Sequence, residues 1–107
     1  MGTLPTGTVT FLFTDIEGST TLAQQYPDDV SALFARHNDI LNQAIEAHNG
    51  FVFKIVGDAY CVAFHHPSDA LNAALEAQRL LHNEEWSLAP VKVRMGMVSL
   101  DRGSQSP

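Results

Sequence analysis

The chain has 107 residues, of which 45% are hydrophobic and 17% charged, and its formal net charge is −6 at pH 7. This length and hydrophobic content predict one globular domain with a buried core. The acidic balance argues against binding to a nucleic-acid backbone, since such surfaces cluster basic residues. A nucleotide site stays open, because bound divalent cations can supply positive charge. One cysteine, no membrane-length apolar run and no signal-peptide pattern predict a cytoplasmic domain.

The first half of the chain predicts one strand followed by two helices. Residues 8–14 are rich in phenylalanine, valine and threonine, as buried strands are. Residues 15–20 interrupt this run with turn and capping residue types, and a short helix is expected after them. A longer helix is expected from Pro27, because apolar residues then recur at spacings of three and four. Asn49-Gly50 would end that helix, with the glycine as its C-terminal cap.

The second half predicts a hairpin, a third helix and a last strand. Gly57-Asp58 separates two apolar runs, which is typical of a tight hairpin with glycine first in the turn. The third helix is expected to bury an apolar stripe, which neighbouring residues widen. The stripe is Leu71, Ala74, Leu75, Gln78 and Leu81, and the residues that widen it are Ala70, Ala73, Ala77 and Leu80. The expected ranges are 51–56 and 59–64 for the hairpin strands, a helix from Pro67, a loop over 84–90, a half-exposed strand over 91–97, and a disordered polar tail over 101–107.

This order of elements predicts a single α+β domain over residues 1–107, with a ferredoxin-like βαββαβ palm. Its antiparallel sheet would carry two helices on one face, with the first and third strands as central neighbours. Asp15 ends the first strand and Asp58 begins the third, so the topology places both carboxylates at one edge. Like charges placed together need a cation between them, and Mg²⁺ prefers carboxylate oxygens combined with substrate phosphates. The sequence therefore predicts a divalent-cation site at Asp15 and Asp58.

Three stretches resemble motifs of the class III adenylate/guanylate cyclases, and the resemblance runs from about residue 7 to residue 97. Two of them resemble the metal-site motifs of that family, and the third resembles the strand that follows in the same domain. They are Phe13-Thr14-Asp15-Ile16-Glu17-Gly18-Ser19-Thr20, Lys54-Ile55-Val56-Gly57-Asp58-Ala59 and Val93-Arg94-Met95-Gly96-Met97.

The resemblance implies a role for each matched residue. Asp15 and Asp58 would bridge two Mg²⁺ or Mn²⁺ ions, and the backbone carbonyl of Ile16 would add a ligand. The backbone amides of Glu17, Gly18, Ser19 and Thr20 would hold a triphosphate at a helix start, where unpaired N–H groups face an anion. Lys54 would select the base and favour adenine.

The resemblance also implies a reaction and a partner. The family's reaction is attack of the ribose 3′-hydroxyl on the α-phosphate with release of pyrophosphate, which two metals assist. For this chain the expected reaction is the conversion of ATP to cyclic AMP. Its sites form at a head-to-tail dimer interface, so the chain would form a homodimer or pair with another cyclase domain.

Two departures from the family pattern lead to alternative predictions. Val98-Ser99-Leu100 replaces the usual histidine-threonine-glycine run, and no residues match the second base-selecting residue or the transition-state asparagine and arginine. The chain is therefore expected to be a truncated palm with weak or no activity alone. The main alternative is a non-catalytic dimerisation or regulatory module, and a third is a ferredoxin-like domain with no nucleotide role. ATP against GTP stays open, because Lys54 is half of the selecting pair.

The other chemically active side chains favour structural roles. His65-His66 lacks a third zinc ligand at a suitable spacing, which indicates a loop. His37 and His48 lie on the apolar stripe of the long helix and are expected at the edge of the core. Trp86 is expected to attach its loop to the core.

Overall fold

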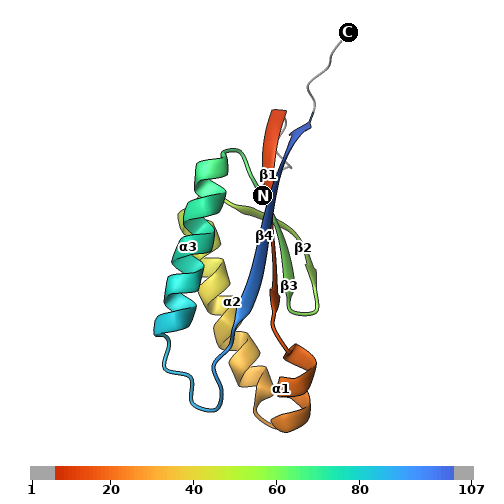
Figure 1. The fold of residues 1–107 in the computed structure, drawn as a ribbon, viewed down its shortest axis with the longest axis vertical. Coiled ribbons are helices and arrows are strands. Elements are labelled where there is room, and N and C mark those ends of the chain that lie inside the picture. The colour runs from red at the N-terminus through yellow and green to blue at the C-terminus, as the bar shows by residue number, and fades with distance from the viewer. Residues whose placement is uncertain (1–6, 103–107) are drawn as a thin grey trace.

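The computed structural model describes residues 7–102, and within them it confirms the α+β architecture. This part of the chain forms four strands and three helices. Helices α2 and α3 lie side by side over one face of the sheet, while α1 follows the end of β1 (Figure 1). No helix in this part of the chain is both long and apolar enough to cross a membrane. The elements are β1 Gly7–Ile16, α1 Ser19–Gln25, α2 Val30–Ala47, β2 Phe51–Val56, β3 Ala59–Phe64, α3 Pro67–Asn83 and β4 Val93–Arg102.

The sheet has the strand order β2-β3-β1-β4, and its neighbouring strands are antiparallel. The central β1 pairs with β3 so that Thr10 faces Phe64 and Thr14 faces Tyr60. The C-terminal end of β1 therefore lies beside the N-terminal end of β3, as the ferredoxin-like order predicted. On the other side of β1, Asp15 faces Arg94 of β4.

Alternate residues of β1 serve two different layers, because successive side chains in a strand point to opposite faces. Leu12 and Ile16 belong to the main core beneath the helices, together with residues such as Ile40 and Leu41 of α2. Val9 and Phe11 point to the opposite face and pack with Ala63 of β3. We call this second surface the open face of the sheet.

The open face carries exposed apolar side chains. Phe13 of β1 is 43% exposed, and Val98 and Leu100 of β4 are 44% and 50% exposed. Val98 pairs with Phe11 and Leu100 pairs with Val9, so the two β4 residues lie beside the buried residues of the open face. The described residues thus leave a half-covered apolar surface on the side of the sheet without helices.

The ends of α2 differ from the prediction. The helix begins at Val30 rather than Pro27, because Pro27 to Asp29 form a turn whose Asp29 amide bonds to the Tyr26 carbonyl. At the other end Asn49, with φ 63°, adopts the left-handed conformation assigned to Gly50. Gly50 is required for a different reason. A β-carbon there would lie 2.7 Å from Ile45 Cγ2 and 2.8 Å from Phe64 Cζ.

The face that α3 buries was predicted only in part. Leu71 and Leu75 are 47% and 59% exposed, whereas Ala70, Ala73 and Ala77 are buried with Leu81. Small alanine side chains let α3 approach its neighbours closely, so the alanine row rather than the leucine row faces the core.

Strand β4 is longer than the sequence indicated. It runs to Arg102, because Asp101 pairs with Thr8 and Arg102 pairs with Gly7. The first two residues of the expected tail are therefore strand, and residues 103–107 lie outside the described part of the chain.

Candidate functional site

The hairpin between β2 and β3 places Asp58 against the end of β1. Val56 pairs with Ala59, so Gly57 and Asp58 form a two-residue turn in which Gly57 has φ 61°. Asp58 Oδ2 accepts a hydrogen bond of 2.6 Å from the backbone N–H of Ile16. This bond joins two segments 42 residues apart in sequence and fixes the Asp58 carboxylate beside the residue that follows Asp15.

Asp15 itself makes an ion pair with Arg94, its cross-strand partner on β4. The guanidinium donates from Nε to Oδ1 at 3.0 Å and from Nη2 to Oδ2 at 2.9 Å. Both side chains are substantially exposed, Arg94 at 63% and Asp15 at 43%. The hydrogen bond to Asp15 raises the pKa of Arg94, and the negative charges of Asp15, Glu17 and Asp58 raise it further. Three carboxylates therefore act on one guanidinium at this end of the sheet.

A cavity of about 290 Å³ lies beside this ion pair. Its walls come from the paired strands β1, β3 and β4, so the site opens at the sheet rather than between the helices. The lining residues are Phe13, Thr14, Asp15, Ala59, Tyr60, Cys61, Arg94, Met95 and Gly96.

The segment predicted to hold a triphosphate forms a turn between β1 and α1. Gly18 has φ 67°, a left-handed conformation that favours glycine, and α1 begins at Ser19. The amides of Ser19 and Thr20 belong to the first helical turn and have no partner within the helix. The Glu17 N–H, in contrast, donates to the Lys92 carbonyl at 2.8 Å. The Glu17 amide is therefore paired with the edge of the sheet, while the anion-binding role of residues 17–20 stays a prediction.

Lys54 lies on the same side of the sheet as Asp15. It pairs with Cys61 after an irregularity between Val52 and Lys54, and Cys61 in turn pairs with Phe13. Because Phe13 and Asp15 are two residues apart on one strand, they share a face. Lys54 is exposed on the edge strand β2, where its ammonium group is accessible to a ligand on the open face.

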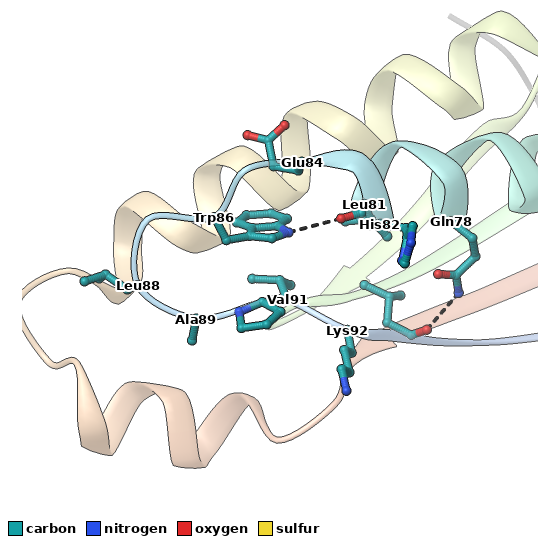
Figure 2. Close-up of a pocket in the computed structure, with 11 residues that line it drawn as sticks. Gln78, Leu81, His82, Glu84, Trp86, Leu88, Ala89, Val91 and Lys92 are labelled. Carbon is teal, nitrogen blue, oxygen red and sulfur yellow. Dashed lines mark hydrogen bonds between the residues drawn. The ribbon is translucent and has the colours of Figure 1, made fainter.

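A second cavity, of about 680 Å³, lies between the end of α3, the loop over residues 84–92 and the start of β4. Figure 2 shows Trp86 and Leu81 on one side of it and Lys92 on another. Trp86 Nε1 donates to the Leu81 carbonyl at 3.1 Å, which confirms that the tryptophan attaches its loop to the helix. Gln78 Nε2 similarly donates to the Val93 carbonyl at 2.8 Å.

The histidines differ in burial: His37 is buried, His48 is half-buried as expected for the edge of the core, and the others are exposed. His37 is fully buried rather than at the core edge, with Nδ1 2.8 Å from Asn38 Oδ1. Its Nε2 has no hydrogen-bond partner within the described residues. Burial lowers the pKa of His37, while the bond to Asn38 and the Asp58 charge oppose this shift. His48 Nε2 lies 2.7 Å from Glu76 Oε1, and His65 and His66 are exposed.

The chemistry of Asp15 and Asp58 fits a hard divalent cation. Each carboxylate offers about four lone-pair positions, so the single bond from Ile16 leaves Asp58 able to bind a metal. The bidentate bond to a guanidinium shows that Asp15 attracts a cation at this position. Residues 7–101 contain no cluster of three or more histidine, cysteine, aspartate or glutamate side chains placed to hold one ion. The ion would therefore depend on phosphate oxygens for part of its coordination, as Mg²⁺ commonly does.

The model of the family described as the adenylate and guanylate cyclase catalytic domain matches residues 2–99. The chain belongs to this family. The cyclase motifs at Asp15 and Asp58 thus lie within the matched range, and the family predicted from them is confirmed.

The relatives of this cyclase-family domain are longer proteins. It is 37% identical over 97 residues to an adenylate cyclase of Lachancea kluyveri, and 40% identical over 95 residues to an uncharacterised protein of Mycobacterium tuberculosis. These alignments cover 91% and 87% of the chain but 5% and 31% of the relatives. A solved structure of Trypanosoma brucei adenylate cyclases in their monomeric state is 26% identical, with a TM-score of 0.83. That match covers 92% of this chain and 58% of the other.

Arg94 is the site residue that sequence reasoning missed, since it was assigned to the strand without a functional role. The signal was nevertheless available. The ferredoxin-like order makes β1 and β4 antiparallel neighbours, and the Val-Arg-Met-Gly strand would then bring its arginine towards the end of β1.

Proposed function

We propose that this domain is the metal-binding palm of a nucleotidyl cyclase, which binds Mg²⁺ or Mn²⁺ with a nucleoside triphosphate. The hydrogen bond from Ile16 N to Asp58 Oδ2 is the observation that carries the proposal, because it holds the second carboxylate at the end of the strand that bears the first. ATP is favoured, since Lys54 matches the adenine-selecting lysine of the family and an adenylate cyclase is 37% identical.

Each part of the site would contribute a separate function. Asp15 and Asp58 would hold the cations, which polarise the α-phosphate and stabilise the charge of the leaving pyrophosphate. The amides of Ser19 and Thr20 would orient the triphosphate at the helix start. Lys54, on the same face, would contact the base. The residues thus position the nucleotide, and the reaction is the conversion of ATP to cyclic AMP and pyrophosphate.

A complete site is proposed to need a second domain. The matched part of the chain covers 58% of the trypanosomal cyclase chain, and no residue here matches the family's transition-state arginine. We therefore propose weak or no turnover by these residues alone, and pairing with a second copy or another cyclase domain. The alternative, a non-catalytic dimerisation module, is favoured by the exposed apolar residues of the open face.

The proposal predicts that Asp58→Asn and Asp15→Asn lose metal-dependent nucleotide binding. The amide is nearly isosteric but lacks the charge, so Mn²⁺ affinity in the presence of a non-hydrolysable ATP analogue should fall about tenfold or more. Isothermal titration calorimetry would measure it, with Asp28→Asn, an exposed aspartate of the 27–29 turn, as the charge-matched control.

Cyclic AMP formation then separates the two functions. The chain would be assayed with Mn²⁺–ATP alone and after mixing with a full-length cyclase whose metal aspartates are substituted. If the mixture forms cyclic AMP with the wild-type chain but not with Asp58→Asn, this domain supplies the metal-binding aspartates of an active cyclase site. Equal Mn²⁺ affinity in wild type and both site variants would show that the paired-aspartate site is wrong.

A further inference from the structure

The Arg94 guanidinium occupies both oxygens of Asp15, at 3.0 and 2.9 Å. We propose that Arg94 is an internal cation that competes with the divalent metal for Asp15, so that the domain loads metal only when this ion pair opens. The inference rests on the proposed metal site and adds a control on its occupancy. The ion pair then sets the cation concentration at which the site fills.

The geometry makes simultaneous binding unfavourable. A guanidinium presents planar, parallel N–H donors that match a carboxylate in a two-point contact. With Oδ1 and Oδ2 both accepting from Arg94, a metal at the same carboxylate would face the positive group directly across the shared oxygens. The like charges repel, so one cation must leave as the other enters.

The ion pair is also placed where it can open. Arg94 is 63% exposed at the edge strand β4, and the pair borders the 290 Å³ cavity, so the side chain can move without unpacking the core. The charge of Glu17, which is not one of the proposed metal ligands, also acts on the guanidinium, so one carboxylate besides the metal ligands lies within electrostatic range of Arg94. The contact is therefore a reversible one and does not secure the fold.

The chain supplies a matched control for this ion pair. Arg36 of α2 donates from Nε and Nη2 to the two carboxylate oxygens of Glu84, each at 2.9 Å. This second pair has the same two-point geometry and a 46% exposed arginine, but its carboxylate is not one of the proposed metal ligands. Substitution of Arg36 removes the same charge and the same kind of contact elsewhere in the molecule.

The test compares Mn²⁺ affinity, with and without a non-hydrolysable ATP analogue, in wild type, Arg94→Gln, Arg94→Lys, Arg36→Gln and Asp58→Asn at constant ionic strength. Electron paramagnetic resonance of free Mn²⁺ gives the affinity directly. Arg94→Gln should bind Mn²⁺ roughly two- to fivefold more tightly than wild type, the range expected for loss of an exposed ion pair. Arg94→Lys, which keeps the charge but not the fork, should fall between the two. Arg36→Gln should match wild type.

A second readout follows the arginine itself. The Nε–H resonance of Arg94, assigned by its loss in Arg94→Gln, should shift and exchange faster with water as Mg²⁺ is added. The Arg36 resonance should stay unchanged under the same titration.

The outcomes distinguish this inference from the proposed function. If Asp58→Asn weakens Mn²⁺ binding but Arg94→Gln equals wild type, the metal site stands and the competition is overturned. If Asp58→Asn and wild type bind Mn²⁺ equally both with and without the ATP analogue, the metal site and the competition both fall. An Arg94 resonance unmoved at saturating Mg²⁺ would also overturn the competition.

Discussion

His37 is the buried side chain whose charge state most directly affects the fold. It is fully buried, its ring meets the Tyr60 ring edge-on at 6.0 Å between centroids, and its Nε2 has no partner within the described residues. Burial disfavours the protonated imidazolium and lowers the pKa of His37, against the smaller opposing effects of Asn38 and Asp58. The folded domain thus prefers a neutral histidine.

This preference predicts a loss of stability in mild acid. Below pH 6.5 His37 binds a proton in the unfolded chain but stays neutral in the folded domain. The free energy of unfolding therefore falls as the pH drops from 6.5 towards the lowered pKa of folded His37. The slope would reach up to about 1.4 kcal/mol per pH unit. Urea unfolding of wild type and His37→Gln at pH 7.5, 6.5 and 5.5 measures it.

The glutamine variant should be less stable at pH 7.5 but should show a flatter dependence over this range. His65→Gln, which removes an exposed histidine, should keep the wild-type slope. An identical slope in wild type and His37→Gln would contradict the assignment of this pH dependence to His37.

At the scale of elements, the end of α2 requires a glycine at residue 50 because neighbouring side chains approach its backbone closely, and not because of its backbone conformation. Gly50 is not in the left-handed region, since Asn49 takes that role, yet a β-carbon at residue 50 would press on Ile45 and Phe64. Phe64 is fully buried at the end of β3, so it cannot move aside without disturbing the core. The junction between α2 and β2 can therefore pack this closely only because residue 50 has no side chain.

Gly50→Ala should accordingly lower the free energy of unfolding by about 1–3 kcal/mol, the usual cost of overpacking a core. Gly96→Ala is the matched control, because a β-carbon at that position on β4 meets nothing within 4 Å. The control should change stability by less than about 0.5 kcal/mol. Thermal or urea unfolding of both variants would decide, and equal stabilities would show that residue 50 has room to relax.

At the scale of the whole molecule, the fold was predictable because it depends on features that a sequence displays. Alternation, helical spacing and the Gly57-Asp58 turn define the element order, and that order brings Asp58 to the end of β1. The roles of the site residues in binding metal and nucleotide stay predictions.

Other features depend on exact register and packing distance, which periodicity does not fix. The pairing of Arg94 with Asp15 needs the β1–β4 register. The burial of His37, and of alanines rather than Leu71 on α3, depends on how closely the layers approach. Neither quantity follows from the spacing of apolar residues along one element, because both are set by partners distant in sequence.

The open face of the sheet makes a final prediction about assembly. The proposed pairing of cyclase domains needs an apolar contact surface. Val98 and Leu100 on β4 offer half-exposed apolar side chains beside the buried Val9 and Phe11 of β1. The double variant Val98→Thr, Leu100→Thr places β-branched residues, which suit strands, at both positions but removes apolar contact area. Loss of roughly 1–2 kcal/mol of association free energy would raise the dimer dissociation constant about five- to thirtyfold.

Sedimentation equilibrium over a range of concentrations measures this constant. The double variant Leu71→Gln, Leu75→Gln is the control, because those leucines are 47% and 59% exposed on α3, on the opposite side of the sheet (Figure 1). It should associate as the wild type does if the open face is the dimer surface. Association weakened only by the α3 variant would instead place the interface on the helices. In that arrangement Asp15 and Lys54, which share the open face, would not face a partner domain across the contact.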